Sequence, residues 1–181
     1  MEENKEIIFK TNKYKIKIFT MVDFKNFCDI NQDPVVAKYV NHNDGKPKTF
    51  RECVEKYNDI AYAQNKYGFS YWAIYDVNSN EFIGQCGAIK SWLGEINFCY
   101  AFRKKYWGKG IGTEICGLVR DYLFKNFKEI EELTCSAFSE NIASVKLLKK
   151  LGFSVIKIEK EFNKDLEFFK LTRKEYEEKN I

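Results

Sequence analysis

Polar and apolar residues alternate along several short stretches of the chain, which is the period of a strand with one buried face. The clearest stretch is KYKIKIFT, from Lys13 to Thr20. The runs FSYWAIYDV and EFIGQCGAI lie on either side of Asn78-Ser79-Asn80, and turn residues between two such runs predict an antiparallel hairpin. Further strands are predicted at residues 95–102, 132–138, 153–160 and 166–172.

Apolar residues recur at spacings of three and four in other segments, which predicts helices with one buried side. Asp33-Pro34 and the loop NHNDGKPK, residues 41–48, predict breaks between such segments, and Gly152 stands in the C-cap place of the last one. The predicted helices are residues 22–30, 50–65, 111–127 and 141–151.

These elements predict a single α+β domain over residues 1–181, with helices inserted among mainly antiparallel strands in a three-layer α/β/α arrangement. A chain of 181 residues, 45% of them hydrophobic, can bury one substantial core. No stretch approaches the roughly 20 apolar residues of a membrane span, and residues 1–10 lack the apolar core of a signal peptide. We therefore expect a cytoplasmic protein without a membrane partner.

The reactive side chains restrict the chemistry. Six cysteines, at positions 28, 53, 86, 99, 116 and 135, are widely separated and mostly lie in apolar periodic segments, so we expect reduced core residues. The single histidine, His42, argues against an ordinary zinc site and a catalytic triad, and we expect no metal. The formal net charge of +4 favours contact with anions but predicts no nucleic-acid partner.

Three of the ten glycines, Gly108, Gly110 and Gly112, stand at alternate positions in YWGKGIGTEI, directly before a predicted helix. A Walker A loop requires GxxxxGK[ST] and a dinucleotide fingerprint requires GxGxxG, and neither spacing is present. A strand that turns directly into a helix leaves the first N–H groups unpaired, and the helix dipole adds about half a positive charge there. The segment therefore predicts a pyrophosphate site, with a simple tight turn as the alternative.

The run RKKYWGKGIGTEICGLVRDYLF and, after a strand, SENIASVKLLKKLGF resemble the acetyl-CoA-binding half of the GNAT superfamily of N-acetyltransferases. The likeness is strongest to the RimJ/RimL-type protein N-acetyltransferases, whose IGxxG and EIGY strands resemble FIGQCGAI and GEINFCYAF. It implies a GNAT fold whose sheet splays between its fourth and fifth strands, here residues 98–102 and 133–138. It also implies direct transfer of an acetyl group from acetyl-CoA to an amine.

In that family the pyrophosphate lies on the N–H groups of the strand-to-helix turn, and the pantetheine arm pairs with the preceding strand. Asn141 matches the family's Asn that contacts the pantetheine, although Asn is also a favoured N-cap and both roles can coexist. The residues that the resemblance assigns to acetyl-CoA are Phe98, Cys99, Tyr100, Ala101, Phe102, Arg103, Trp107, Gly108, Lys109, Gly110, Ile111, Gly112, Thr113, Asn141 and Ser144.

Many GNAT enzymes place a general-acid Tyr seven residues after this Asn, where the present chain has Leu148. We therefore assign protonation of the departing thiolate to Ser144, with water as the alternative. Glu95 is the predicted base, because a carboxylate at the start of the strand beside the slot can hold a proton-accepting water; a merely solvated carboxylate is the alternative. Unranked further candidates are Asp33, His42 and Tyr100.

The acceptor amine must be neutral to attack. Deprotonation at pH 7 costs about 1.4 kcal/mol for an N-terminal amine of pKa about 8, but about 4.6 kcal/mol for a lysine of pKa about 10.4. This favours the α-amine of a protein, such as a ribosomal protein. The alternatives are a polyamine or aminoglycoside, which acidic residues in the cleft would favour, and a catalytically silent acyl-CoA-binding module; a homodimer is also kept open. The acidic residues available for such a cleft are Asp29, Asp33, Asp44 and Glu52.

Overall fold

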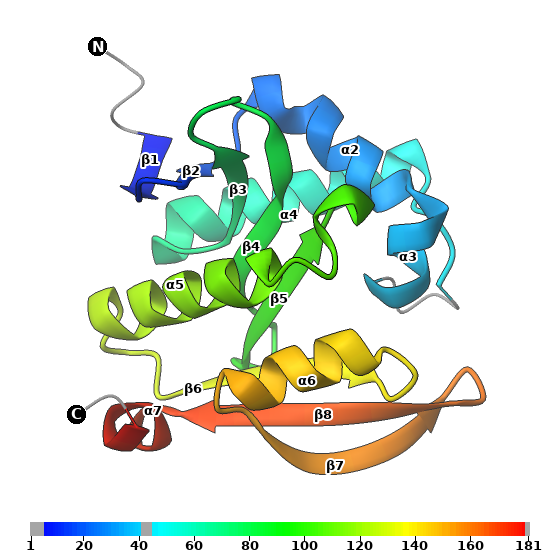
Figure 1. Cartoon of the computed structure of the whole chain (residues 1–181), viewed down its shortest axis with the longest axis vertical. Coiled ribbons are helices and arrows are strands. Elements are labelled where there is room, and N and C mark those ends of the chain that lie inside the picture. The colour runs from blue at the N-terminus through cyan, green and yellow to red at the C-terminus, as the bar shows by residue number, and fades with distance from the viewer. Residues whose placement is uncertain (1–5, 41–44, 180–181) are drawn as a thin grey trace.

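The computed structural model describes residues 6–40 and 45–179. It consists of an eight-stranded sheet with helices on both faces (Figure 1). The strand order is β1-β2-β3-β4-β5-β6-β8-β7, and every neighbouring pair is antiparallel except β5 and β6. The strands are β1 (Ile7–Lys10), β2 (Tyr14–Ile18), β3 (Tyr71–Asp76), β4 (Phe82–Lys90), β5 (Ile96–Phe102), β6 (Glu132–Phe138), β7 (Ser154–Glu161) and β8 (Lys164–Thr172).

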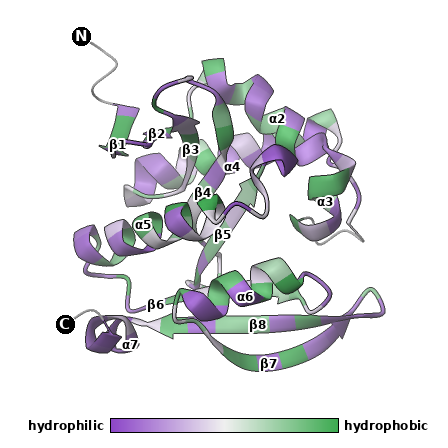
Figure 2. Ribbon diagram, in the orientation of Figure 1, coloured by the Kyte–Doolittle hydropathy of each residue, from purple (hydrophilic) through white to green (hydrophobic). Residues whose placement is uncertain are grey.

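Two buried clusters separate the sheet from the helices. On one face, α2 and α4 pack on β3 through side chains such as Phe27, Tyr57 and Ala73. On the other face, α5 and α6 pack on the sheet through Ile115 and Leu148, and both helices carry green and purple residues, as amphipathic helices do (Figure 2). The predicted three-layer α+β arrangement is confirmed. The helices are α2 (Phe24–Gln32), α3 (Pro34–Val40), α4 (Phe50–Tyr67), α5 (Ile111–Asn126), α6 (Ile142–Lys150) and α7 (Arg173–Lys179), with 3₁₀ turns η1 (Met21–Asp23) and η2 (Lys104–Tyr106).

Helix α2 ends at Asp33-Pro34, as predicted. The next helix, α3, which the sequence did not predict, begins directly at Pro34 without an intervening loop. The Asp33 carboxylate accepts a hydrogen bond from the Val35 N–H at 2.8 Å, and Pro34 is the first helical residue. Proline suits that position, because its missing N–H would have no partner there. The sequence pattern also fails to predict the short strand β1 and the terminal helix α7. Within the described residues, no helix is long and apolar enough to cross a membrane.

The sheet opens between β5 and β6, and this opening positions the site. Asn97 and Thr134 are the one pair of facing residues between these strands, joined by a hydrogen bond of 2.9 Å from Thr134 Oγ1 to Asn97 Oδ1. On its other side β5 pairs with β4 along its whole length, from Ile96 to Phe102. The predicted splay is therefore confirmed. The edge of β5 beyond Asn97 faces a gap.

All six cysteines are free, as predicted, and five of them are buried. The Sγ atoms of Cys86 and Cys116 lie 3.7 Å apart in the core, and burial raises the pKa of the Cys116 thiol well above its ordinary value. Cys99 differs, since it is half-buried. The expectation of reduced core residues therefore holds for the other five.

The buried carboxylate of Asp23 ties the helices to the sheet. It is 1% exposed and accepts hydrogen bonds from the N–H and the hydroxyl of Thr20, both at 2.8 Å, and from the Tyr75 hydroxyl. Lys17 Nζ lies 3.0 Å away, so the buried negative charge has a cationic partner. Burial and the hydrogen bond to Asp23 raise the pKa of Tyr75, which keeps its proton for this bond.

Replacing Asp23 by Ala should lower the free energy of unfolding by about 3–5 kcal/mol, because Lys17 would keep only Glu6 among the described residues as an ion-pair partner, 3.4 Å away and 40% exposed, and the Tyr75 hydroxyl would lose its acceptor. Urea denaturation followed by circular dichroism measures this. The matched control is Glu55→Ala, which removes an exposed carboxylate paired with Arg51 on α4 and should cost about 0.5 kcal/mol or less. Equal effects of the two substitutions would contradict the role given to Asp23.

Candidate active site

The turn from Trp107 to the start of α5 presents a row of unpaired N–H groups. Gly108 and Gly110 have φ values of +72° and +76°, a conformation that favours glycine, and a Cβ atom on either would meet nothing within 4 Å. Among the described residues, no acceptor pairs with the N–H groups of residues 108–113; the first paired one is that of Glu114, 3.1 Å from the Gly110 carbonyl. The turn therefore offers several donors and open space to an anion.

Gly112 has a different role from the other two glycines. A Cβ on it would lie 3.1 Å from the Phe102 ring, so its absence lets α5 begin close against the end of β5. Trp107 reaches back to the same strand end, where its Nε1 donates to the Phe102 carbonyl at 2.7 Å. The turn is thus held directly against the open end of β5.

Charged side chains near the turn are partly engaged elsewhere. Arg103 donates to Asn26 Oδ1 at 2.9 Å, and Lys105 pairs with Glu81 at 2.8 Å. Glu114 in the first turn of α5 bonds Lys13 and Tyr14, each at 2.9 Å, and these two partners hold the pKa of the Glu114 carboxyl below its usual range. Its negative charge is therefore matched on the side of β2.

A cavity of about 330 Å³ lies in front of this turn, and we call it the turn cavity. Its walls include ten of the residues that the sequence assigns to the cofactor: Tyr100, Ala101, Phe102, Trp107, Gly108, Gly110, Gly112, Thr113, Asn141 and Ser144. Side chains that the sequence did not assign complete it, namely Val36, Tyr39, Val40, Tyr106, Ala143 and Leu147.

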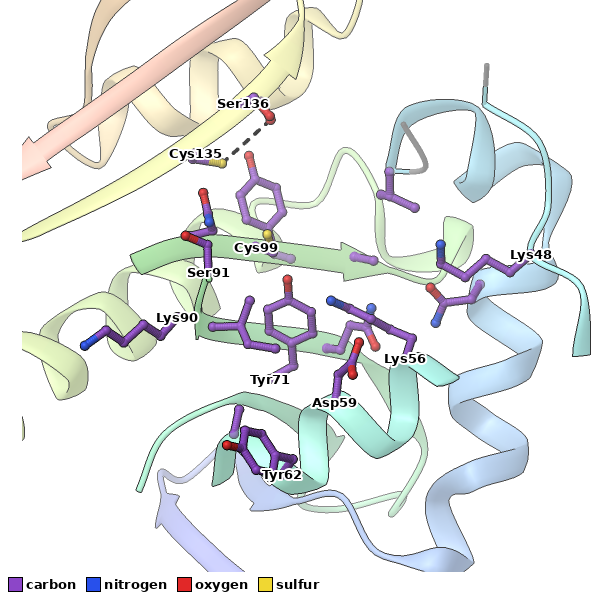
Figure 3. A pocket seen from close by; sticks show the side chains of 18 of the residues that line it. Lys48, Lys56, Asp59, Tyr62, Tyr71, Lys90, Ser91, Cys99, Cys135 and Ser136 are labelled. Carbon is purple, nitrogen blue, oxygen red and sulfur yellow. Dashed lines mark hydrogen bonds between the residues drawn. The ribbon is translucent and has the colours of Figure 1, made fainter. Parts of the chain in front are cut away.

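A second cavity of about 970 Å³, here the large cavity, lies between α4 and strands β3 to β6. Tyr71 and Cys99 stand at its centre, with Lys56 and Asp59 on the helical side (Figure 3). The two cavities share six lining residues: Tyr39, Val40, Tyr100, Ala101, Asn141 and Ser144. They therefore meet at the open edge of β5.

Tyr100 and Ser144 form the polar contact at this junction, with 2.6 Å between Tyr100 Oη and Ser144 Oγ. Asn141 caps α6, as its Oδ1 accepts the Ser144 N–H at 3.2 Å, so the N-cap role of Asn141 is confirmed. Burial raises the pKa of Tyr100 well above its ordinary value, so its hydroxyl is neutral at physiological pH. The junction thus carries a protonated hydroxyl pair and no formal charge. Among the described residues, no three His, Cys, Asp or Glu side chains gather closely enough to hold a metal ion.

Comparison with known proteins identifies this architecture. The family model of the acetyltransferase (GNAT) domain matches residues 16–154. The chain belongs to the GNAT family of acetyltransferases. It is an N-acetyltransferase of the RimJ/RimL-like branch, as the resemblance implied.

Similar proteins agree with this assignment. An uncharacterized N-acetyltransferase, p20 of Bacillus licheniformis, is 26% identical over 175 residues, which cover 92% of this chain and 96% of that protein. Spermidine N-acetyltransferase from Vibrio cholerae, solved with CoA and spermine, has a TM-score of 0.76 at 17% identity and covers 92% of this chain and 99% of its own. Ribosomal-protein-S5-alanine acetyltransferase from Vibrio fischeri has a TM-score of 0.72 at 17% identity, and the match covers 93% of this chain and 97% of that one. The two structures show the shared fold.

Several predicted residues lie outside the turn cavity of this GNAT domain. Phe98 is fully buried in the core, and Cys99 lines the large cavity instead. Arg103, Lys109 and Ile111 are not among the lining side chains, although the N–H groups of Lys109 and Ile111 belong to the unpaired row.

The predicted base is not brought together with Ser144. Glu95 is exposed at the start of β5, where its carbonyl accepts the Ser91 N–H at 2.7 Å, and it lines neither cavity. Asp33 caps α3, and His42 lies outside the described residues. Of the two unranked candidates within the described residues, Asp33 and Tyr100, only Tyr100 stands at the junction. Its place opposite Ser144 depends on the splay and on α6, so no local sequence motif marks it.

Proposed function

We propose that this GNAT protein transfers the acetyl group of acetyl-CoA to the α-amine of a protein N-terminus. The observation that carries the proposal is the meeting of two cavities at Tyr100 and Ser144, one of them ending at a row of free N–H donors. A coenzyme and an acceptor that enter from opposite sides would place their reacting groups at this junction. A neighbour of the same fold was solved in complex with CoA and spermine, so that protein binds a coenzyme and an amine together.

The residues of the turn cavity fit acetyl-CoA. The unpaired N–H groups of residues 108–113, together with the dipole of α5, suit a pyrophosphate. The unpaired edge of β5 near Ala101 suits the amides of the pantetheine arm, and Asn141 lies across the gap on α6. When bound, the coenzyme supplies an activated acetyl thioester; the chain holds it and orients it.

Tyr100 and Ser144 would handle the proton at this junction. As the amine nitrogen bonds the acetyl carbon and the carbon–sulfur bond breaks, the thiolate needs a proton and the new amide loses one. The Tyr100–Ser144 pair can donate a proton toward the sulfur from either hydroxyl, in keeping with the role that we assign to Ser144. The alternative of a catalytically silent module rested on Leu148, which stands where many GNAT enzymes have a general-acid Tyr. Leu148 is fully buried in the core, and the Tyr100–Ser144 pair offers another proton donor, so this alternative loses support.

The surroundings of the junction favour an α-amine over a lysine as acceptor. Among the described residues that line the large cavity, Asp59 is the one carboxylate, and it is exposed. A weak or water-mediated base is enough for an amine of pKa about 8 but not for one of pKa about 10.4.

A polyamine finds less support, because the acidic residues expected in its cleft do not line the large cavity where the structure describes them. Asp29 pairs with Lys25 at 2.8 Å, while Asp33 and Glu52 cap helices, and none of the three lines the large cavity. Asp44 lies outside the described residues.

Gly110→Glu should abolish acetyl-CoA binding, with at least a hundredfold rise in Kd by calorimetry, because a carboxylate would stand where the phosphates bind. The matched control is Gly94→Glu. Gly94 also has a positive φ, +92°, and open space for a Cβ, but it lies before β5 and lines neither cavity. Both variants carry the same backbone strain, so equal affinity in the two would contradict the phosphate site.

Tyr100→Phe should lower kcat about a hundredfold, at the lower end of what general acids contribute, and leave the Kd for acetyl-CoA unchanged. Steady-state kinetics with an N-terminal peptide measure this, with Tyr122→Phe as control, since Tyr122 lines neither cavity.

The pH profile of the wild type tests the same role. Because burial raises the pKa of Tyr100, its hydroxyl keeps its proton as the pH rises. The wild-type kcat/KM should therefore increase up to about pH 8, as the amine loses its proton, and then stay level to about pH 10. A decline near pH 9 would argue against Tyr100 as the proton donor.

A further inference from the structure

Four lysines but a single carboxylate line the large cavity among the described residues: Lys48, Lys56, Lys66, Lys90 and Asp59. Lys66 and Lys90 are exposed at the rim, whereas Lys48 and Lys56 are half-buried. Figure 3 shows the side chains of Lys48 and Lys56 reaching toward the space beside Tyr71. The deeper part of the cavity is therefore cationic.

None of these four lysines forms an ion pair with a carboxylate of the described residues. Lys56 Nζ lies 5.1 Å from the centre of the Tyr71 ring, a contact that attracts the ammonium but leaves its charge unmatched. Glu52, one turn away on α4, is held by the N–H and hydroxyl of Thr49 at 2.7 and 2.8 Å. The Thr49 contacts and, to a lesser extent, the charge of Lys48 lower the pKa of Glu52, but no described carboxylate forms an ion pair with Lys48 or Lys56. Half-buried cations without an ion-paired carboxylate favour a ligand that brings negative charge.

Gln85 provides an independent sign of a ligand in the same cavity. It is 8% exposed, lines the cavity from β4, and its Oε1 is buried without a hydrogen-bond partner. A buried amide oxygen without a donor is unfavourable, so its place in a cavity wall suits a ligand that brings an N–H donor. The unpaired atom is an acceptor, which a peptide N–H and an ammonium group suit alike, so the preference for a peptide over a polyamine rests on the cavity lysines, which would repel a polycation.

We infer that the acceptor is the N-terminal segment of an acidic protein, with Asp or Glu among the residues that follow its α-amine. Lys48 and Lys56 bind the acidic side chains, and Gln85 binds the peptide backbone. The inference rests on the N-acetyltransferase function proposed above and names the substrate class of the same site.

The first experiment compares three hexapeptides that share Ser at position one and differ at positions two to four, which are Asp/Glu, Ala/Gly or Lys/Arg. Mass spectrometry follows acetylation by the full chain with acetyl-CoA, and spermidine serves as a fourth acceptor. We expect kcat/KM to be at least tenfold higher for the acidic than for the neutral peptide, lowest for the basic one, and the preference to shrink as salt is raised.

The second experiment removes the cationic wall. The double variant Lys48→Gln with Lys56→Gln should lower kcat/KM for the acidic peptide at least tenfold, through KM, and change the value for the neutral peptide less than threefold. The matched control is Lys125→Gln with Lys128→Gln, which removes two exposed lysines that line neither cavity. The control should retain the preference for the acidic peptide.

Gln85→Leu tests the carboxamide. The substitution keeps the side chain close in volume and removes a polar group that has no partner, so the variant should unfold at the same temperature as the wild type or a few degrees higher. KM for the acidic peptide should rise at least fivefold. A lower unfolding temperature with an unchanged KM would assign Gln85 to the core alone and remove its part in binding.

The outcomes separate the two proposals. Acetylation of all three peptides at equal rates would overturn the acidic acceptor and leave the N-acetyltransferase function standing. Acetylation of spermidine in preference to every peptide would overturn both the acidic acceptor and the protein α-amine. No turnover with any acceptor, while acetyl-CoA still binds, would overturn the proposed function and this inference with it.

Discussion

The divergence of β5 from β6 is the constraint on which the site depends. The strands are joined at Asn97 and Thr134 and then separate, which leaves the far edge of β5 without a strand partner on that side. Backbone groups of this kind need hydrogen bonds, and here they face a space enclosed by α3, the start of α5 and α6. The opening arises from the sheet, and it determines where the two cavities meet.

Charge is distributed along this space in a way that suits the proposed chemistry. The free N–H groups before α5 make the turn cavity electropositive, and Lys48 and Lys56 make the large cavity electropositive as well. Tyr100 and Ser144, where the two cavities meet, are uncharged. Nearby cations lower the pKa of an amine, because they disfavour its ammonium form. A lysine-lined cavity would thus help an acceptor to reach its neutral form, which reduces the need for a dedicated base such as Glu95.

Local signals allowed much of the fold to be predicted from the sequence. Alternation predicted β2, and apolar runs with turn residues between them predicted the other strands except β1. The glycines at 108, 110 and 112 located the turn before α5. The errors occur where distant contacts decide. The sequence predicts only a break at Asp33-Pro34, because the capping of α3 by Asp33 is visible only in the structure. The role of Glu95 as a base stays a prediction, and Glu95 lines neither cavity. The meeting of Tyr100 with Ser144 and the gathering of the cavity lysines depend on packing between segments far apart in sequence, which no single segment encodes.

Cys99 is the most exposed of the six thiols, and it lines the large cavity together with Cys135, which is 9% exposed. Burial raises the pKa of Cys99, so the thiolate that reacts with alkylating reagents is scarce at neutral pH and increases under alkaline conditions. A small electrophile would therefore modify Cys99 slowly, and Cys135, whose pKa burial raises well above its ordinary value, more slowly still. An occupant of the large cavity would shield the Cys99 sulfur, and the rate of alkylation at Cys99 would measure how fully the cavity is occupied.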